Sequence, residues 1–243
     1  MDFLITGDIH GDFYQIEKNI SKDIDLKQTG IIILGDAGFN YFGENDKRDL
    51  RVKRMAEDFG CYIYCVRGNH DFRPQHLSTI VLEFDENVQG KVYYEPAFPH
   101  IRYFKDFGIY TIGKWKTGVI GGAYSVDKEY RLMQGWHWFS DEQLADIEMN
   151  TCYNKFKGNC FDLMLTHTCP YDWRPTDLFL SSIDQSKVDN SMEKFLQIIS
   201  EDVEWKNWFW GHYHRNRVYP TNKNNQNRIM FFDDIVKLEE IVV

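Results

Sequence analysis

Several features that mark other classes of protein are scarce or missing here. The five cysteines are odd in number and include no C-x-x-C pair, which argues against a disulfide framework and fits a reducing compartment. No run of about 18 apolar residues occurs, so we expect no membrane-spanning helix. The N-terminus lacks the basic segment and the apolar stretch of a signal peptide, so we expect a cytoplasmic protein.

Basic residues are also in the minority. The chain holds 28 Lys and Arg against 37 Asp and Glu, which gives a formal net charge of −9. Proteins that grip nucleic-acid phosphates usually present a basic face, so this balance disfavours a nucleic acid as partner without excluding a local basic patch. An acidic enzyme that handles anionic phosphates needs positive charge at its site, and bound metal ions supply it.

Internal repeats and low-complexity linkers are absent from the sequence. Its 243 residues suit one domain with a full-sized core, and its hydrophobic content of 43% is ordinary for a globular protein. The one strongly polar stretch, residues 222–227, predicts an exposed turn between two strands. We therefore expect a single domain over residues 1–243, and the oligomeric state stays open.

What the sequence does contain is a recurring unit, in which a short apolar run leads directly into Gly, Asp, Asn or His. Runs of this length and composition are typical of buried strands. They occupy residues 3–6, 31–34, 61–66, 161–166 and 207–210. In open α/β sheets, sites form at the carboxyl ends of strands, so these polar residues are expected to converge in space.

The segments between the runs complete an α/β pattern. Residues 12–21 and 46–59 have helical length and spacing, and strand–helix–strand alternation predicts parallel strands with crossover helices. Residues 91–124 instead break into short strands separated by Pro and Gly turns. The remaining predictions are helices at residues 140–149, with Ser140 as N-cap and Gln143 completing a capping box, and at 191–200, and strands at 229–232 and 235–238.

Two of the polar motifs have the geometry of a metal site. Residues i and i+2 of an extended segment point to the same side, so Asp8 and His10 can reach one metal ion, and His212 and His214 repeat this spacing. A glycine precedes several of these residues, which allows tight turns and close backbone approach. Each motif alone has an ordinary structural explanation. Five strand ends that each deliver a metal-type ligand favour one shared site.

The ordered set G-D-I-H, G-D, G-N-H-D, T-H and G-H-Y-H, from Asp8 to His214, resembles the calcineurin-like metallophosphoesterase superfamily. This resemblance implies an α/β fold, a four-layer α/β/β/α sandwich of two mixed sheets with metals at one sheet edge. It also implies a metal-dependent phosphoric ester hydrolase, a phosphatase or phosphodiesterase, in which a metal-activated hydroxide attacks phosphorus. The overall layout looks like small bacterial or phage members.

Carried over residue by residue, the resemblance implies roles for eight side chains. His70 would lie near the scissile phosphate as general acid or charge stabiliser, without binding metal. The implied ligands are Asp8, His10 and His214 for the first divalent ion, Asn69, His167 and His212 for the second, and Asp36 as a bridge between both. Two ions about 3.5–4 Å apart can clamp an in-line displacement at phosphorus. Mixed nitrogen and oxygen ligands without thiolate suit manganese, our first expectation, with iron, zinc and nickel as alternatives.

One motif departs from the protein Ser/Thr phosphatases of the superfamily, which carry G-D-x-x-D-R-G. Here Phe39 stands at the second Asp and Asn40 at the Arg, while the third motif ends in Asp71 rather than Glu. The carboxylate that would orient His70 and the Arg that would hold phosphate are thus missing from their usual places. A Ser/Thr-type protein phosphatase remains an alternative. A metal-bound scaffold or interaction module is an alternative of another class, disfavoured because every ligand position is filled.

The candidate substrate contacts lie outside the motifs. Lys128 and Arg131, in the segment 121–138, are predicted phosphate contacts, and aromatic residues of that segment favour a nucleotide-like substrate by stacking. A packed surface loop with solvated charges is the alternative for the whole segment. Arg174 follows ligand His167 and Arg73 follows the Asn69-His70 motif, so both are further candidates for substrate binding.

Overall fold

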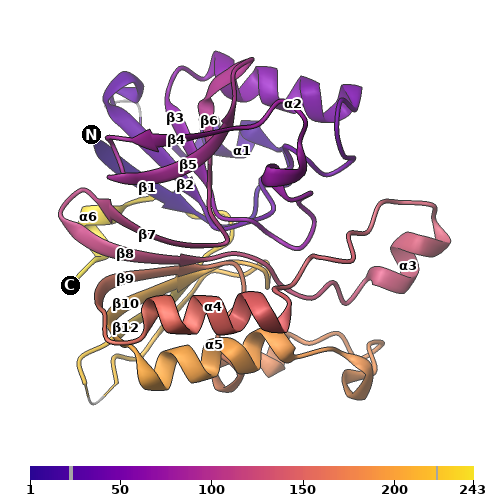
Figure 1. Ribbon diagram of the computed structural model, residues 1–243, viewed down its shortest axis with the longest axis vertical. Helices are drawn as coiled ribbons and strands as arrows, with labels where there is room; N and C mark the ends of the chain where they lie inside the picture. The colour runs from indigo at the N-terminus through magenta and orange to yellow at the C-terminus, as the bar shows by residue number, and fades with distance from the viewer. Residues whose placement is uncertain (22–23, 223) are drawn as a thin grey trace.

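The computed structural model describes residues 1–21, 24–222 and 224–243. Two mixed β-sheets lie face to face at its centre, and helices cover their outer faces (Figure 1). The four-layer α/β/β/α sandwich expected from the sequence is therefore confirmed. Among the described residues, no helix has the length and apolar character needed to cross a bilayer. The turn predicted at residues 222–227 includes Lys223, which lies outside the described residues.

The first sheet is built around four parallel strands. Its spatial order is β13 (Val236–Lys237), β1 (Asp2–Thr6), β2 (Thr29–Ile33), β3 (Tyr62–Cys65), β6 (Phe98–Phe104), β5 (Gly90–Glu95) and β4 (Val81–Asp85). The four central strands β1, β2, β3 and β6 run parallel, and β13, β5 and β4 run antiparallel to their neighbours. Crossovers from β1 to β2 and from β2 to β3 carry α1 (Phe13–Asn19) with the 3-10 turn η1 (Leu26–Gln28), and α2 (Lys47–Asp58). A further turn, η2 (Pro74–His76), precedes β4.

The second sheet repeats this plan with different chain connections. Its spatial order is β11 (Arg217–Tyr219), β12 (Asn227–Met230), β10 (Glu204–Trp210), β9 (Cys160–Thr166), β8 (Trp115–Ile120) and β7 (Phe107–Ile112). Strands β12, β10, β9 and β8 are parallel. The helices α4 (Asp146–Phe156) and α5 (Ser191–Asp202) cover the outer face (Figure 1). The chain closes with α6 (Leu238–Ile241) beside β1.

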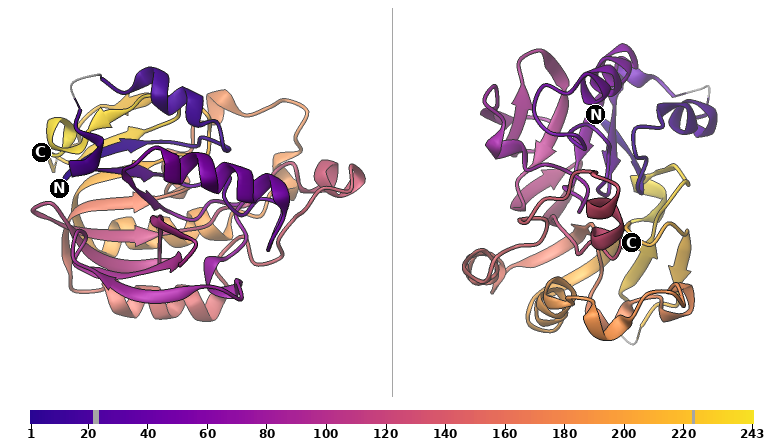
Figure 2. Two further views of the ribbon diagram at one scale, coloured as in Figure 1. Left: turned by 90° about the horizontal axis from the view of Figure 1, so that it is seen from above. Right: turned by 90° about the vertical axis from the view of Figure 1, so that its right-hand side faces the viewer.

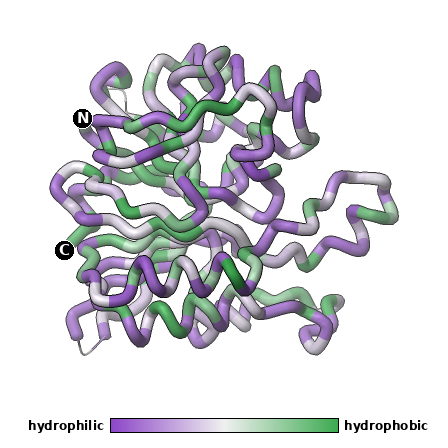
Figure 3. Tube along the Cα trace, viewed as in Figure 1, coloured by the Kyte–Doolittle hydropathy of each residue, from purple (hydrophilic) through white to green (hydrophobic). Residues whose placement is uncertain are grey.

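Alternation along the strands explains the layering. In β1, Phe3 and Ile5 belong to the core between the two sheets, whereas Leu4 packs on the helix side. The same division recurs in β2, where Ile32 faces the second sheet and Ile31 faces the helices. Because both faces are buried, the central strands are nearly continuous hydrophobic runs, visible along the trace in Figure 3. Such runs are what the sequence analysis recognised as strands.

Two predicted elements are wrong in place or kind. The helix expected at residues 140–149 begins only after Ala145, whose N–H donates to the Glu148 carboxylate at 2.9 Å, so Ser140 is not its N-cap. The backbone before it is held otherwise: Arg67 donates to the Glu142 carbonyl at 2.7 Å, and Arg73 donates to backbone carbonyls on either side. The strand expected at residues 235–238 is β13 followed directly by α6.

Two long excursions leave the second sheet at the carboxyl ends of its strands. Residues 121–145 follow β8 and carry α3 (Lys128–Met133), which projects from the body of the molecule (Figures 1 and 2). Residues 167–190 follow β9 and carry the 3-10 turns η3 (Tyr171–Trp173), η4 (Thr176–Leu178) and η5 (Gln185–Lys187). Both excursions begin at the sheet edge where the polar motifs lie, so they flank the space above that edge.

Candidate functional site

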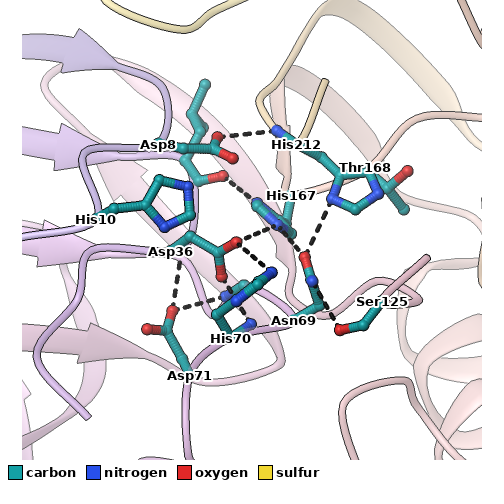
Figure 4. A network of polar contacts seen from close by, with 12 residues as sticks. Asp8, His10, Asp36, Asn69, His70, Asp71, Ser125, His167, Thr168 and His212 are labelled. Atoms are coloured by element: carbon teal, nitrogen blue, oxygen red, sulfur yellow. Dashed lines mark hydrogen bonds and ion pairs between the residues drawn. The ribbon is translucent and has the colours of Figure 1, made fainter. Parts of the chain in front are cut away.

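The sheet topology brings all seven predicted metal ligands to one place. They sit just beyond the carboxyl ends of β1, β2 and β3 in the first sheet and of β9 and β10 in the second. Figure 4 shows most of these side chains pointing toward one another across the gap between the two sheets. The convergence follows from parallel pairing, since β1, β2 and β3 end side by side, as do β9 and β10.

One half of the cluster is formed by Asp8, His10 and His214. The Nε2 atom of His214 lies 3.3 Å from Asp8 Oδ2 and 3.1 Å from His10 Nε2. Asp8 is buried, and its Oδ1 accepts a hydrogen bond from the backbone N–H of His212 at 2.8 Å. Its Oδ2 has no hydrogen-bond partner among the described residues. Two imidazole nitrogens and a free carboxylate oxygen therefore converge on one point, as they would around a cation.

The other half is formed by Asn69, His167 and His212. Asn69 Oδ1 lies 2.9 Å from His167 Nε2 and 3.0 Å from His212 Nδ1, so one amide oxygen faces two imidazoles. Asp36 joins the halves: its Oδ2 lies 3.5 Å from His167 Nε2, and ligand atoms of Asp8, Asp36 and His167 are close enough to share an ion.

The protonation of His167 tests whether a cation fits. Its Nδ1 lies 2.7 Å from the Leu34 carbonyl oxygen, so Nδ1 carries a proton and donates it. When the ring is neutral, the lone pair on Nε2 faces the oxygens of Asn69 and Asp36. This lone pair and the oxygens repel one another unless a positive charge lies between them. Accordingly, although burial lowers the pKa of His167, the charges of Asp36 and Asp8 outweigh it and raise this pKa to about 9. A divalent ion satisfies the same need without a proton, so the residues fit a metal.

The pKa values of three further ligands are shifted by burial and by neighbouring charges. Burial acts to raise the pKa of Asp36, but the neighbouring imidazoles of His70 and His167 hold it well below its ordinary value. Burial and the charge of His167 lower the pKa of His212 to about 3, which leaves its ring neutral with a lone pair to offer. The carboxylate of Asp8, whose Oδ2 lies 3.3 Å from His214 Nε2, raises the pKa of His214.

The backbone at the ligands is held in an uncommon conformation. His10, Asp36, His212 and His214 have φ angles of 46°, 49°, 70° and 48°, in the left-handed region that side chains other than glycine seldom occupy. Such conformations persist where the surrounding structure fixes them, and they gather at functional sites. Four of the seven candidate ligands share this feature, which no pattern in the sequence predicts.

The glycines before the ligands are required for close approach, as expected. A Cβ on Gly68 would lie 1.9 Å from Asp36 Oδ1, and one on Gly211 would lie 2.2 Å from Asp8 Oδ1. Neither position accepts a side chain while the carboxylates stay where they are. These two glycines therefore let neighbouring loops close onto the acids.

A ring of further residues, which sequence reasoning did not assign, fixes the ligands. Asp71 Oδ2 accepts from the backbone N–H of Asp36 at 3.1 Å and of Gly68 at 2.9 Å, and burial raises its pKa to about 7. Asn69 Nδ2 donates to Ser125 Oγ at 2.9 Å, and Ser125 donates to Glu142 at 2.6 Å. A signal existed for Asp71, which ends a motif, and for Ser125, which follows the apolar run of β8. Glu142 offered none.

His70 lies at the mouth of the cluster and is mostly buried. Its Nε2 is 3.9 Å from Asp36 Oδ2 and 4.0 Å from Asp127 Oδ1, and its ring stacks on Tyr41 with centroids 5.7 Å apart. Burial lowers the pKa of His70; Asp36 opposes this shift and the charge of Arg131 adds to it. The imidazole thus faces the cluster without belonging to either ligand group.

Arg131 reaches this neighbourhood from the excursion after β8. Its side chain is fully buried, its guanidinium lies 4.9 Å from the centroid of the Tyr41 ring, and its three nitrogens have no hydrogen-bond partner among the described residues. Burying a charged guanidinium without a hydrogen-bond partner lowers the stability of the fold, so Arg131 is suited to pair with an anion.

A cavity of about 430 Å³ opens over the cluster. Its floor includes His10, Asp36, Asn69, His70, His212 and His214, and its walls come from the two excursions. Of the four predicted substrate contacts, Arg174 lines this cavity, whereas Lys128 lies 3.8 Å over the Trp138 ring and Arg131 sits behind His70. Trp136 and Trp138 do not line it either, which leaves Tyr124 as the aromatic wall residue from that segment.

Arg73 is a structural residue and does not line this cavity. Its guanidinium is buried and pairs with Glu148 at 2.6 Å and Asp106 at 3.3 Å, while also donating to the Asp141 and Gln143 carbonyls. The prediction of a substrate contact was wrong in placing it at the cleft: following a motif in sequence does not decide which way a side chain turns. It instead anchors the approach to α4.

Comparisons with known proteins identify the family of the chain. The family model described as calcineurin-like phosphoesterase matches residues 1–216. Among solved structures, the chain is similar to a phosphopantetheinyl hydrolase from Mycobacterium tuberculosis, with 10% identity, 94% of this chain and 88% of that chain covered, and a TM-score of 0.49, a likeness too weak to inform function. A comparison with functionally curated proteins finds no match. Because this family model spans residues 1–216 of the 243, the chain belongs to the calcineurin-like phosphoesterases, which are phosphoester hydrolases.

Proposed function

We propose that this protein hydrolyses phosphomonoesters or phosphodiesters with the help of two divalent metal ions, held by the seven converging side chains. The observation that carries the proposal is the meeting of two buried carboxylates, four imidazoles and one amide oxygen at one sheet edge, where neighbouring ligand atoms lie 2.9–3.5 Å apart. Asp8, His10 and His214 would hold one ion, Asn69, His167 and His212 the other, and Asp36 would touch both. When bound, such ions lower the pKa of water and neutralise charge on phosphate oxygens.

The chain's own groups supply the remaining chemistry. His70 faces the cluster from the cavity floor, where its imidazole can protonate or stabilise the leaving oxygen. Tyr41 stacks on the His70 ring, and Arg131 packs against the Tyr41 ring, so Tyr41 holds the imidazole in place. Asp71 fixes the loops that present Asp36 and Asn69, which keeps the ligand geometry rigid.

Asp127 and Arg131 can replace the Asp and the Arg that the second motif of this chain lacks. The superfamily's phosphatase branch has an Asp and an Arg where this chain has Phe39 and Asn40. Here Phe39 is buried among the apolar residues of the first sheet, and a carboxylate and a guanidinium approach His70 from the excursion after β8. We propose that Asp127 orients His70 and that Arg131 provides positive potential behind it. This arrangement is not that of the protein-phosphatase motif and disfavours that alternative.

We propose manganese as the native metal and keep iron, zinc and nickel as alternatives, because the ligand set contains nitrogen and oxygen atoms but no thiolate. The intact ligand set and His70 also weigh against the scaffold alternative, since a scaffold need not keep them. Purified protein should turn over p-nitrophenyl phosphate or its bis-ester when Mn²⁺ is added and stop after chelation. Absence of turnover on both esters with every one of these metals would contradict the proposal.

Asp36→Asn is the sharpest single test, because Asp36 touches both proposed ions. The amide keeps the shape but lacks the charge, so we expect a loss of about a thousandfold or more in kcat with reduced metal content. Elemental analysis after dialysis measures the content and an ester assay measures kcat. A matched control is Asp146→Asn, at the exposed start of α4, which should change neither. Full activity in Asp36→Asn would rule out a bridging role.

A further inference from the structure

We propose that the organic part of the substrate is uncharged and largely apolar, carries one hydrogen-bond donor, and is recognised through that donor by Glu193. This inference deepens the function proposed above and rests on it, since the phosphate is taken to sit over the ligand cluster. The organic part would then extend into the space between the excursions at residues 121–145 and 167–190, which form the cavity walls.

The walls are apolar. The cavity is lined beyond the ligand cluster by Val126 from one excursion and by Leu178, Phe179, Leu180, Ile183 and Val188 from the other. Leu180 is 65% exposed and Val126 is 45% exposed, so these side chains are in water until something covers them. Apolar surface gathered in a concave site favours an apolar ligand, because covering it removes that surface from water.

Positive charge is nearly missing from the walls. Apart from the imidazoles, Arg174 is the one basic side chain lining the cavity in the described part of the chain. Its guanidinium is already engaged with Asn190 Oδ1 at 2.5 Å and the Tyr171 carbonyl at 2.9 Å, and it stacks on the Tyr171 ring. Asp127 adds a negative charge to the lining. A polyphosphate chain or an acidic phosphopeptide would find little to pair with here.

Among the described wall residues, Glu193 is the one with a buried polar atom that has no hydrogen-bond partner. It lies in the first turn of α5, lines the cavity, and is only 4% exposed. Its Oε1 accepts from Thr168 Oγ1 at 3.1 Å, but its Oε2 has no hydrogen-bond partner among the described residues. Burial raises the pKa of Glu193 to about 7, and Thr168 and Arg174 offset this shift only in part. A buried acceptor without a partner at the edge of a cavity is completed by a ligand that brings an O–H or N–H group.

The test compares matched pairs of substrates. The metal-loaded wild-type protein is assayed with ω-hydroxyalkyl phosphates and with the ω-methoxy esters of the same chain length, which cannot donate. At the best chain length we expect kcat/KM to favour the hydroxyl compound by about tenfold to a hundredfold, the range for a hydrogen bond to a charged group. Nucleoside triphosphates should be poorer than either. Equal rates for the pair, or a preference for triphosphates, would overturn the inference.

Glu193→Met removes the acceptor at similar length and should abolish the preference within the pair. Glu201→Met is the matched control, because Glu201 lies exposed at the far end of the same helix, and it should keep the preference. Melting curves confirm folding of both variants. A preference that survives Glu193→Met contradicts the role of this carboxylate.

A binding measurement separates this inference from the proposed function. The Kd of ω-hydroxyalkyl and ω-methoxyalkyl phosphonates, measured by calorimetry before and after metal removal, should keep the same ratio although both affinities fall without metal. If p-nitrophenyl phosphate is never hydrolysed, the proposed function fails while the phosphonate ratio still decides the role of Glu193. If the ester is hydrolysed and the phosphonates bind equally, only the present inference fails.

Discussion

The ligand cluster and the cavity walls above it are built in different ways. The ligand cluster lies at the ends of central strands, and each ligand is at most a few residues from a strand end. The walls are two long excursions with little regular structure, and part of the backbone of the first is held by Arg67 and Arg73, which are about seventy residues away in sequence. We therefore expect the cluster to be rigid and defined by local sequence, and the walls to be defined by tertiary packing.

This difference predicts where small changes have large effects. In the ligand cluster, a substitution that adds one carbon atom to a side chain has no room. In the cavity walls, the added carbon would lie in solvent. Three substitutions probe the comparison, and they run from the floor of the site to its rim.

Gly68→Ala should have the largest effect of the three. Its Cβ would lie 1.9 Å from Asp36 Oδ1, so the carboxylate or the loop must shift. Because a displacement near 1 Å in a catalytic group can cost about a hundredfold, we expect at least that loss in kcat/KM on p-nitrophenyl phosphate, with weakened metal binding. Gly158→Ala is the control for the site: a Cβ there meets nothing within 4 Å, and the strain of alanine at its φ of 77° should lower the melting temperature but leave kcat/KM and metal binding unchanged. Equal activity in both variants would mean that the floor is not rigid.

Sequence reasoning succeeded in the same region where rigidity is expected. The runs before Asp8, Asp36 and Asn69 form β1, β2 and β3, and parallel pairing of these strands is enough to bring their ends together. Periodicity and composition carry this information, because a strand buried on both faces must be apolar throughout. The fold and the convergence of the ligands could therefore be predicted from local pattern and topology.

The same reasoning failed where side-chain direction depends on packing. Arg73 and Arg131 look equivalent in sequence, each a cation near a motif or an aromatic segment. The structure turns Arg73 toward Glu148 and buries Arg131 behind His70. The helix expected at Ser140 failed for a related reason, since Arg67 and Arg73 hold the preceding carbonyls. No periodicity encodes such contacts, because the partners are separated by about seventy residues.

Ser125→Ala probes the boundary between the two regions. Ser125 belongs to a wall excursion but supports ligand Asn69, to which it is linked at 2.9 Å, and it is tied in turn to Glu142. Removing a hydrogen-bond partner of a metal ligand typically costs about tenfold to a hundredfold in metal affinity, and we expect this loss for one of the two ions. Equilibrium dialysis against Mn²⁺ measures it. Ser140→Ala, an exposed position nearby, is the control, and identical isotherms would exclude the support role.

Leu180→Ser should have the smallest effect of the three, and it tests the tolerance of the cavity walls. Leu180 lines the cavity at its rim and is 65% exposed, so it adds apolar contact to a substrate without holding any ligand. Losing part of that contact is worth about 0.5–1 kcal/mol, so KM for an apolar ester should rise about two- to fivefold with kcat and metal affinity unchanged. Leu132→Ser on α3 is the control, because Leu132 is 48% exposed but does not line the cavity. A fall in kcat or in bound manganese for Leu180→Ser would show that the walls help to position the ions, and the division between a rigid floor and a tolerant rim would then be wrong.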